Sequence, residues 1–429
     1  MVPNSRRAAL KILSEVRGGH PFEAALDRSV GDLTDADRRL AHELAAGVLR
    51  QRSSLDRHLA PLVPRGWDRV PENLRDILRL GAYQLTALDR VPDHAAVDTS
   101  VALAKLSGGV RAGGFVNAVL RRLTRAEAQA PPDGTDAAAL AAEYSHPLWL
   151  VRRWVDRFGA DETAALLRWN NTRPRLVLQP ARETLESLSA RWRAAGIEVE
   201  QAPHGAGLIT NRSRPADLPG YQEGYFIVQD PAQALLTRFI APPAQGAVYD
   251  ACAAPGGKTI ALGRLASSVI AGEVRFSRAR RLAENLARAG SGGEHVVVAD
   301  ARKPPLRSAD LVLVDAPCLG TGTFARHPDA RWRVTPEVLA SLTQLQAQLL
   351  ESTAELVAPG GLLVYSTCSL EPEENEAQVD RFLQSHPEFR RDPGDTVSPT
   401  LLSSAGDLVI LPQRHGMDGA YAARLRRSA

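Results

Sequence analysis

The sequence predicts three successive folds in one multidomain chain: an all-α domain, a small α+β segment, and an α/β domain built on a parallel sheet. The 429 residues are too many for a single ordinary core. Apolar residues recur at helical spacing through the first 125 residues, whereas short apolar runs alternate with helical stretches from about residue 246. We therefore expect a helical domain at 1–126, a linker at 127–143, an α+β subdomain at 144–240 and an α/β domain at 241–429.

The helical domain is predicted from stripes of apolar side chains at positions i, i+3, i+4 and i+7, which lie on one face of a helix. The first stripe consists of Ala9, Ile12, Leu13 and Val16. The same spacing recurs within residues 74–85 and 116–123. Residues 126–142 contain Pro131-Pro132-Asp133-Gly134 and few large apolar side chains, which predicts a linker.

The middle segment mixes helical and strand patterns. Helices are expected at Trp149–Phe158, from Asp161 onward, and at Leu185–Ala195. Strands are expected at Arg175–Leu178, Ile197–Glu200 and Tyr225–Gln229. Short strands interleaved with helices predict a small α+β fold here.

The last segment has the strand, turn and helix rhythm of a parallel sheet. Strands are expected at Ala247–Ala251, Val269–Val274, His295–Ala299, Leu311–Val314 and Gly361–Tyr365. Thr335 and Pro336 form an N-cap pair that begins one linking helix, and Pro359-Gly360-Gly361 ends it. The buried stripe of that helix is predicted to be Val338, Leu342, Leu345 and Leu349. Residues Leu408–Leu411 and Ala420–Leu425 predict an antiparallel hairpin on the sheet edge.

The composition excludes several classes of protein. Hydrophobic residues make up 44% and charged residues 24%, which is typical of globular proteins and not of disordered or collagen-like chains. The three cysteines are too few for a disulfide framework, and no CxxC pair or histidine cluster predicts a metal site. No apolar run is long enough for a signal peptide or a membrane span, so we expect a cytoplasmic protein.

The charge is unevenly distributed along the chain. The net charge is only +3, but residues 1–130 hold 20 Lys and Arg against 15 Asp and Glu, a net of +5. A basic front domain favours a polyanionic partner such as nucleic acid.

The first predicted strand of the α/β domain leads into Asp250-Ala-Cys-Ala-Ala-Pro-Gly-Gly-Lys-Thr259. Small residues and two glycines allow a ligand to approach the backbone at a helix N-terminus. The spacing of a phosphate-binding P-loop is absent. A tight strand-to-helix turn is the alternative, but Lys258, one of only four lysines in the chain, favours a binding loop.

Acidic residues follow the next two predicted strands. Glu273, at the end of the second, can accept hydrogen bonds from both hydroxyls of a ribose. Asp300, at the end of the third, can meet an adenine amino group. Together with the glycine loop they predict a pocket for an adenosine ligand.

Cysteines mark the ends of the fourth and fifth predicted strands, in Asp315-Ala-Pro-Cys318 and Tyr365-Ser-Thr-Cys368. Most free cysteines are buried small hydrophobes. Two at one rim of a sheet, however, favour a thiolate nucleophile. Such a thiolate can add to C6 of a pyrimidine and make C5 nucleophilic toward an electrophilic methyl group, while Asp315 holds or protonates a ring nitrogen.

These motifs carry a family resemblance. Asp250–Thr259, Asp315–Gly322 and Tyr365–Ser369 resemble the motifs of RNA cytosine-C5 methyltransferases that use S-adenosyl-L-methionine. Residues 6–125, with Phe115–Arg121 and Val91–Val97, resemble the NusB-type RNA-binding domain. This pairing, with the closing Leu411–Gly419, is similar to the RsmB (Sun) branch.

The resemblance implies a Rossmann-like methyltransferase domain that forms 5-methylcytosine in 16S ribosomal RNA. It implies that Cys368 is the nucleophile and that Cys318 assists elimination and release of the methylated RNA. The pocket for the cofactor and the base would be lined by Cys252, Ala253, Ala254, Pro255, Gly256, Gly257, Lys258, Glu273, Asp300 and Asp315. We expect Cys252 to be a packing residue of this loop, and we expect a monomer that needs neither membrane nor metal.

The sequence departs from the family pattern at three places. Glu273 stands where the family usually has Asp, Leu319 replaces a usual Ser, and Val177–Pro180 lacks the usual Arg-Val-Asn. Arg326, His327 and Trp332 are either RNA-facing residues or parts of a surface loop with a packed Trp.

Two other functions stay open on the sequence. The substrate could be transfer RNA or large-subunit RNA. The chain could instead be a non-catalytic RNA-binding assembly factor, although intact Cys318 and Cys368 argue against that reading.

Overall fold

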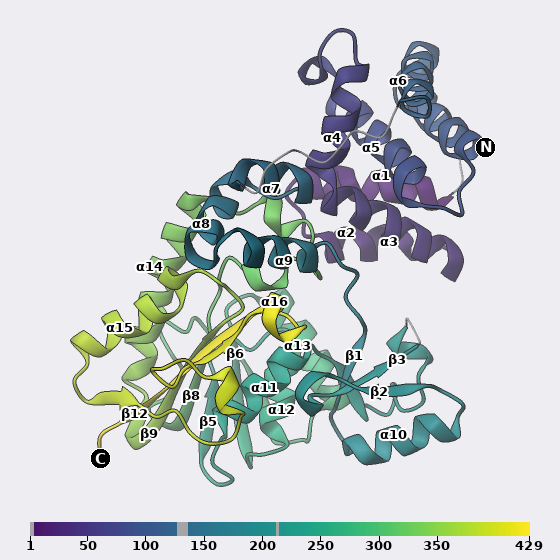
Figure 1. The fold of residues 1–429 in the computed structure, drawn as a ribbon. Coiled ribbons are helices and arrows are strands. Elements are labelled where there is room, and N and C mark those ends of the chain that lie inside the picture. Colours follow the sequence, from purple (N-terminus) through teal and green to yellow (C-terminus); the bar gives the residue numbers. More distant parts are fainter. Residues whose placement is uncertain (1–3, 127–135, 212–213) are drawn as a thin grey trace. The chain divides into compact units, whose positions relative to one another are not determined.

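The computed structural model describes residues 4–126, 136–211 and 214–429. The chain forms two compact units (Figure 1). The first, the helical unit, contains residues 1–173 together with Phe324–Arg333. The second, the sheet unit, contains Pro174–Thr323 and Val334–Ala429.

The helical unit confirms the prediction of helices through the first 125 residues. Its apolar stripes form one core that includes Ile12, Leu44, Ile77 and Leu120, all fully buried. Helix α6 is kinked at Gly108 and Gly109. The helices are α1 (Asn4–Arg17), α2 (Phe22–Val30), α3 (Asp35–Arg50), α4 (Arg52–Leu59), α5 (Glu72–Ala87), α6 (Asp93–Leu123), α7 (Ala137–Tyr144), α8 (Leu148–Phe158) and α9 (Ala160–Asn170). The short 3-10 helices are η1 (Ala60–Leu62), η2 (Trp67–Arg69) and η6 (Ala330–Trp332).

The predicted linker at 127–143 is wrong over its second part. Residues 127–135 lie outside the described residues, but Ala137–Tyr144 form α7. The side chain of Asp136 accepts a hydrogen bond from the Ala139 N–H and caps the helix. The high helix propensity of the alanines outweighs the lack of large apolar residues.

Residues 324–333 belong to the helical unit although they follow the Pro-Cys motif in sequence. Arg331 is fully buried there, and its guanidinium donates to the carbonyls of Arg50, Ser145 and Asn170 and to the side chain of Asn171. Those groups lie at the C-terminal ends of α3, α7 and α9. The partial negative charge of three helix ends therefore takes the place of a carboxylate partner.

Burial, with Arg50 nearby, lowers the pKa of Arg331 to about 9, so the side chain remains charged at neutral pH. Three further hydrogen bonds tie the same segment to α2 and α3. The Trp332 indole donates to the Leu49 carbonyl at 2.8 Å, the Phe22 N–H donates to Asp329, and Arg50 donates to the Ala325 carbonyl. The loop that sequence analysis left as either RNA-facing or packed is packed at Trp332.

The sheet unit begins with a four-stranded antiparallel sheet in the order β2-β3-β1-β4. Its strands are β1 (Val177–Pro180), β2 (Val199–Gln201), β3 (Leu208–Thr210) and β4 (Phe226–Val228). Helix α10 (Leu185–Ala194) buries Leu188 and Trp192 in this core. The α+β prediction is confirmed, although β1 begins two residues later than expected and β3 was not predicted.

The large sheet has the order β10-β12-β9-β8-β5-β6-β7, and β11 pairs with β12. Figure 1 shows its strands side by side. The strands are β5 (Ala247–Asp250), β6 (Ser268–Glu273), β7 (Glu294–Val298), β8 (Ala309–Asp315), β9 (Val357–Thr367), β10 (Phe389–Arg391), β11 (Leu408–Ile410) and β12 (Ala420–Arg427). Strands β5 to β9 are parallel, as predicted.

The predicted C-terminal hairpin is confirmed, but β12 is not an edge strand. It pairs with β9 on one side and with β10 on the other. The sequence prediction missed β10 because its three residues, Phe389–Arg391, contain two arginines and no apolar alternation.

Helices cover both faces of the large sheet because alternate strand residues pack into different cores. Leu313 and Val364 lie in the core with α11, whereas Val314 and Tyr365 lie in the core with α14 and α15. These helices are α11 (Pro231–Ile240), α12 (Gly257–Gly263), α13 (Phe276–Ala289), α14 (Pro336–Ala354), α15 (Glu376–Ser385) and α16 (Pro412–His415). The short 3-10 helices are η3 (Pro203–Gly205), η4 (Pro215–Asp217), η5 (Thr321–Thr323), η7 (Pro372–Glu374) and η8 (Pro399–Leu401).

The predicted start of α14 is confirmed, because Thr335 accepts a hydrogen bond from the Val338 N–H. Its predicted stripe and end are partly wrong. Val338 is 39% exposed, and Leu339, Gln346 and Leu350 are buried instead. The helix ends at Ala354, so Pro359-Gly360-Gly361 lies within β9.

Within the described residues, no helix is both long enough and apolar enough to cross a membrane.

We predict that Arg331→Met destabilises the protein by at least about 3 kcal/mol. The change leaves several buried carbonyls at helix ends without a donor, and each such group costs about 1–3 kcal/mol. Urea unfolding of the full chain measures the effect. Arg90→Met, at an exposed loop position, is the matched control and should change the free energy of unfolding by less than about 0.5 kcal/mol. Equal effects of the two changes would contradict this account of Arg331.

Candidate active site

The candidate site lies where the strand order reverses, between β5 and β8. In parallel α/β sheets, ligands bind beyond the carboxyl ends of the strands at this point. A cavity of about 350 Å³ opens there. Of the predicted site residues, its lining includes Cys252, Ala254, Glu273, Asp300, Asp315, Cys318 and Cys368. The remaining predicted residues, Ala253, Pro255, Gly256, Gly257 and Lys258, belong to the adjoining loop and the start of α12.

The loop after β5 is held from two sides. The Ala253 N–H donates to the Gly272 carbonyl on β6. Arg278 and Asn285 on α13 donate to the carbonyls of Ala254 and Pro255, both at 2.8 Å. Gly256 has a φ of 109°, and a side chain there would meet Leu282, so the turn requires glycine. The loop backbone is therefore fixed in position.

Glu273 and Asp300 face the same cavity, and each contacts an arginine. Glu273 is buried, accepts a hydrogen bond from the Arg275 N–H and lies 3.4 Å from Arg278. Arg302 donates to both oxygens of Asp300, and these hydrogen bonds lower the pKa of Asp300. Sequence reasoning missed Arg302, although its position two residues after Asp300 was a usable signal.

Asp250 is a fully buried carboxyl at the end of β5. One oxygen accepts a hydrogen bond from the Thr259 hydroxyl at 2.7 Å, and the other has no partner among the described residues. Burial, with a contribution from the nearby Asp315, raises the pKa of Asp250 to about 7.

Asp315 ends β8 and lies between two polar partners. Lys258 donates to one carboxylate oxygen at 2.7 Å, and the Ser366 hydroxyl donates to the other at 2.8 Å. Burial lowers the pKa of the Lys258 ammonium. The ion pair with Asp315 outweighs this effect, so the pKa is raised overall. Lys258 therefore orients Asp315.

The two cysteines predicted at the rim are brought together. The sulfurs of Cys318 and Cys368 lie 3.4 Å apart. The pKa of Cys318 is raised well above its usual range by the hydrogen bond to Cys368, by burial and by the charge of Glu374. Cys318 is thus a neutral thiol at physiological pH.

A polar network behind the cysteines was missed by sequence reasoning. The Leu319 N–H donates to Glu374 at 3.0 Å. Gln346 donates both to Glu374 and to the Pro317 carbonyl. The Gly322 N–H donates to the Cys368 carbonyl at 2.9 Å, which joins the two motifs directly. Gln346 could have been found, because it is a polar residue on the apolar face of α14.

Cys252 stays outside this pair. Burial, with Asp250, Asp315 and Glu273 nearby, raises its pKa to about 12, so it remains a thiol. Its side chain packs against the core of α14 and β9, in agreement with the packing role expected for it. In the described part of the chain, no three His, Cys, Asp or Glu side chains are grouped as a metal site would require.

Known proteins match this chain over nearly its whole length. A family model described as 16S rRNA methyltransferase RsmB/F matches residues 237–426. A probable ribosomal RNA small subunit methyltransferase B from Synechocystis is 36% identical and spans 99% of this chain and 100% of its own. The chain therefore belongs to the RsmB family of RNA methyltransferases. Its relatives include a Bacillus subtilis protein of the same name, 32% identical over 98% of each chain.

Family models also match the two segments that precede the methyltransferase domain of this RsmB-family chain. A NusB family model matches residues 3–125, and a model of a ferredoxin-like domain from RsmF/B-like methyltransferases matches 146–216. The crystal structure of PH0851 is 27% identical, with a TM-score of 0.83 over 100% of this chain and 99% of that one. The predicted NusB-like and Rossmann-like parts are confirmed.

The cofactor of this RsmB-family methyltransferase is S-adenosyl-L-methionine. The site fits that molecule in size and donor set. The cavity volume of about 350 Å³ lies within the roughly 300–1,000 Å³ of cofactor sites. Glu273 and Asp300 line the cavity and supply carboxylate oxygens with further lone pairs.

We predict that Asp250 makes the free energy of unfolding fall as the pH rises from about 4 to 7. Its pKa is about 7 in the folded protein and about 3.9 when unfolded, so the folded state binds more protons in this window. The stabilisation that protonated Asp250 contributes is complete below pH 4 and is lost above pH 7. In Asp250→Asn this dependence is absent. The wild type should therefore lose stability relative to the variant, by on the order of 3 kcal/mol across the window.

Urea unfolding of both proteins at pH 4.5 and at pH 7.5 measures this difference. A difference that stays constant between the two pH values would contradict the raised pKa.

Proposed function

We propose that this RsmB-family methyltransferase forms 5-methylcytosine in small-subunit ribosomal RNA through a covalent adduct with Cys368. The observation that carries the proposal is the pair of sulfurs 3.4 Å apart, which line the cofactor cavity together with Asp315. The substrate class is supported by the relatives' names, which specify the small-subunit ribosomal RNA. Two thiols within reach of one base suit a reaction that must both add to and leave the ring.

Cys368 is the nucleophile. Its sulfur forms a bond to C6 of a cytosine taken out of the base stack, and the ring electrons make C5 nucleophilic. Asp315, fixed by Lys258 and Ser366, holds the edge of the base. When bound, S-adenosyl-L-methionine supplies an electrophilic methyl group. Cys318 then assists the elimination: its thiol proton passes to the Cys368 sulfur as the C6–S bond breaks, and Cys318 takes up the C5 proton as the C5–C6 double bond forms again.

The surroundings of the two thiols support this assignment. The ammonium of Lys258 lies near enough to Cys368 for the two side chains to interact electrostatically. The hydrogen bond to Cys368, burial and the charge of Glu374 all raise the pKa of Cys318 and disfavour its thiolate. We therefore assign Cys368 as the nucleophile and Cys318 as the thiol that transfers a proton during elimination. Spacing in the sequence cannot make this distinction.

The cofactor roles stay proposals of the same kind. We propose that Glu273 binds the ribose, that Asp300 contacts the adenine, and that the 252–258 loop approaches the methionine part. We also propose that residues 1–126, 144–240 and 241–429 are separate domains and that the enzyme is a monomer.

We predict that Cys368→Ala abolishes methyl transfer to RNA, with a loss of at least about 10³-fold, because the neighbouring Cys318 is a neutral thiol and does not replace the nucleophile. Cys318→Ala should accumulate a covalent protein–RNA adduct, because elimination is blocked after Cys368 has attacked. Transfer of labelled methyl groups to a small-subunit RNA transcript measures the first effect. Denaturing gel electrophoresis measures the second.

The double variant Cys318→Ala with Cys368→Ala is the control and should form no adduct. Normal turnover by Cys318→Ala without an adduct would overturn the assigned roles. Bisulfite sequencing of RNA from a deletion strain identifies the substrate, and a lost signal in transfer RNA or large-subunit RNA would overturn small-subunit RNA as the target. If the protein neither binds S-adenosyl-L-methionine nor transfers a methyl group, it is an assembly factor.

A further inference from the structure

The helical unit contains a cavity of about 190 Å³ whose walls come from α1, α3, α4, α5 and the 324–333 segment. We call it the Arg52 pocket. It is lined by Leu13, Val16, Arg17, Gly19, Val48, Leu49, Arg52, Glu72, Asp76, Arg79, Asp329, Trp332 and Arg333. Four arginines and one tryptophan thus surround a single small cavity.

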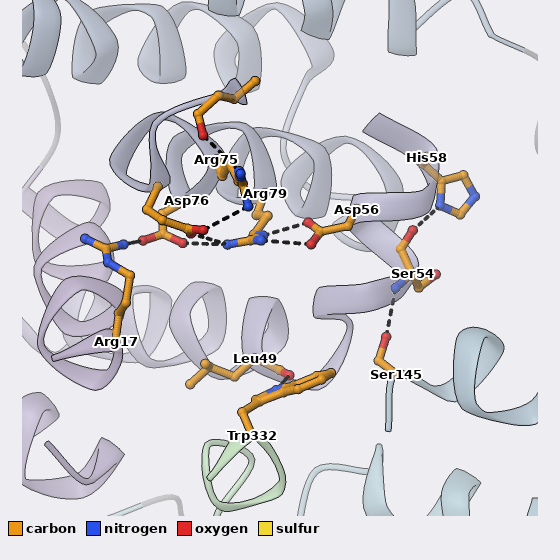
Figure 2. A network of polar contacts seen from close by, with 12 residues as sticks. Arg17, Leu49, Ser54, Asp56, His58, Arg75, Asp76, Arg79, Ser145 and Trp332 are labelled. Carbon is orange, nitrogen blue, oxygen red and sulfur yellow. Dashed lines mark hydrogen bonds and ion pairs between the residues drawn. The ribbon is translucent and has the colours of Figure 1, made fainter. Parts of the chain in front are cut away.

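Three of the four arginines are neutralised by carboxylates. Arg79 donates to Asp56 and Asp76, and Arg17 pairs with the other oxygen of Asp76 (Figure 2). Arg333 pairs with Asp329 at 2.7 Å. These pairs form the walls of the cavity.

Arg52 differs from the other three. Among the described residues, no carboxylate lies within ion-pair distance of its guanidinium, which instead lies 5.4 Å from the centroid of the Trp332 ring. Burial, and after it the nearby Arg79, lower the pKa of Arg52, and the more distant carboxylates of Asp56, Asp76 and Glu72 only partly offset this effect. A half-buried cation beside a second cation gains free energy when an anion enters the cavity.

The pocket is rigid before any ligand arrives. Trp332 is fixed by the hydrogen bond from its indole to the Leu49 carbonyl (Figure 2), and Arg331 anchors the segment behind it. A preformed cationic site loses little entropy on binding.

The volume decides what can bind. At about 190 Å³ the cavity is smaller than the roughly 300–1,000 Å³ of cofactor sites, so it accepts a small anionic group and not a nucleoside cofactor. A planar guanidinium matches the oxygens of a phosphate group. The size of the cavity and the charge of Arg52 together fit one phosphate group of a nucleic acid backbone.

We propose that the Arg52 pocket binds a phosphodiester group of the RNA substrate, with Arg52 as the anion contact and Trp332 as the wall beside it. This inference rests on RNA being the substrate, as proposed above. The pocket is built from the helical unit alone, and its residues take no part in the chemistry at Cys368.

Full-length Arg52→Gln, Arg52→Lys and the control Arg90→Gln test the proposal with a small-subunit RNA transcript. Arg52→Gln should weaken RNA binding about tenfold and lower the slope of log Kd against log salt by about 1, because one phosphate contact is lost. The KM for RNA should rise while kcat is unchanged. Arg52→Lys, which keeps the charge, should retain the salt slope, and Arg90→Gln should resemble the wild type.

Equal behaviour of Arg52→Gln and Arg90→Gln in Kd and salt slope would overturn the proposal. Binding is measured without methyl transfer, so failure of the catalytic proposal leaves this readout intact. A second measurement covers a variant that folds poorly. Inorganic phosphate should raise the Tm of the wild type and of Arg90→Gln more than that of Arg52→Gln, and the same rise in all three would also overturn it.

Discussion

The active site depends on the parallel pairing of β8 and β9, in which Asp315 lies opposite Ser366. The two motifs that follow these strands are more than 40 residues apart in sequence, and only this register brings Cys318 and Cys368 to one rim. Because side chains alternate along a strand, a slip of one residue would turn Asp315 away from Ser366 and separate the sulfurs. Fully buried Leu313 and Val364 on one face, and Val314 and Tyr365 on the other, fix the register.

The register alone does not set a distance of 3.4 Å, because the cysteines lie on loops. The loops are fixed by main-chain groups. The Gly322 N–H bonds the Cys368 carbonyl, and the Leu319 N–H bonds Glu374. A side chain at Gly322 would meet the backbone of Gly419 and Cys368, so the close approach of the two loops requires glycine. The catalytic geometry is thus a property of the buried loop backbone as much as of the sulfurs.

The sequence was sufficient where function follows local pattern. Leu311–Val314 and Val269–Val274 predict strands because their apolar runs are continuous, and a parallel sheet then places Cys318 and Cys368 at one edge. It was insufficient where a residue's role depends on distant partners. Glu374 contacts Leu319 across 55 positions, and Arg331 contacts the ends of three helices that converge only in the folded unit. A charged residue in a loop otherwise predicts a solvated surface, which is why neither role was predicted.

Arg331 also explains why the loop after the Pro-Cys motif can belong to the helical unit. A carboxylate partner would have to be buried with it, and a buried ion pair costs desolvation of two charges. Backbone carbonyls at helix ends have no partner within their own helices and must be satisfied in any case. One guanidinium can donate to several of them at once, so the charge that is buried also completes the ends of α3, α7 and α9. The chain leaves the sheet unit at Thr323 and returns at Val334, and this anchor fixes the intervening residues. The same residues form one wall of the Arg52 pocket. Residues 324–333, which follow Cys318 in the sequence, therefore pack as part of the helical unit.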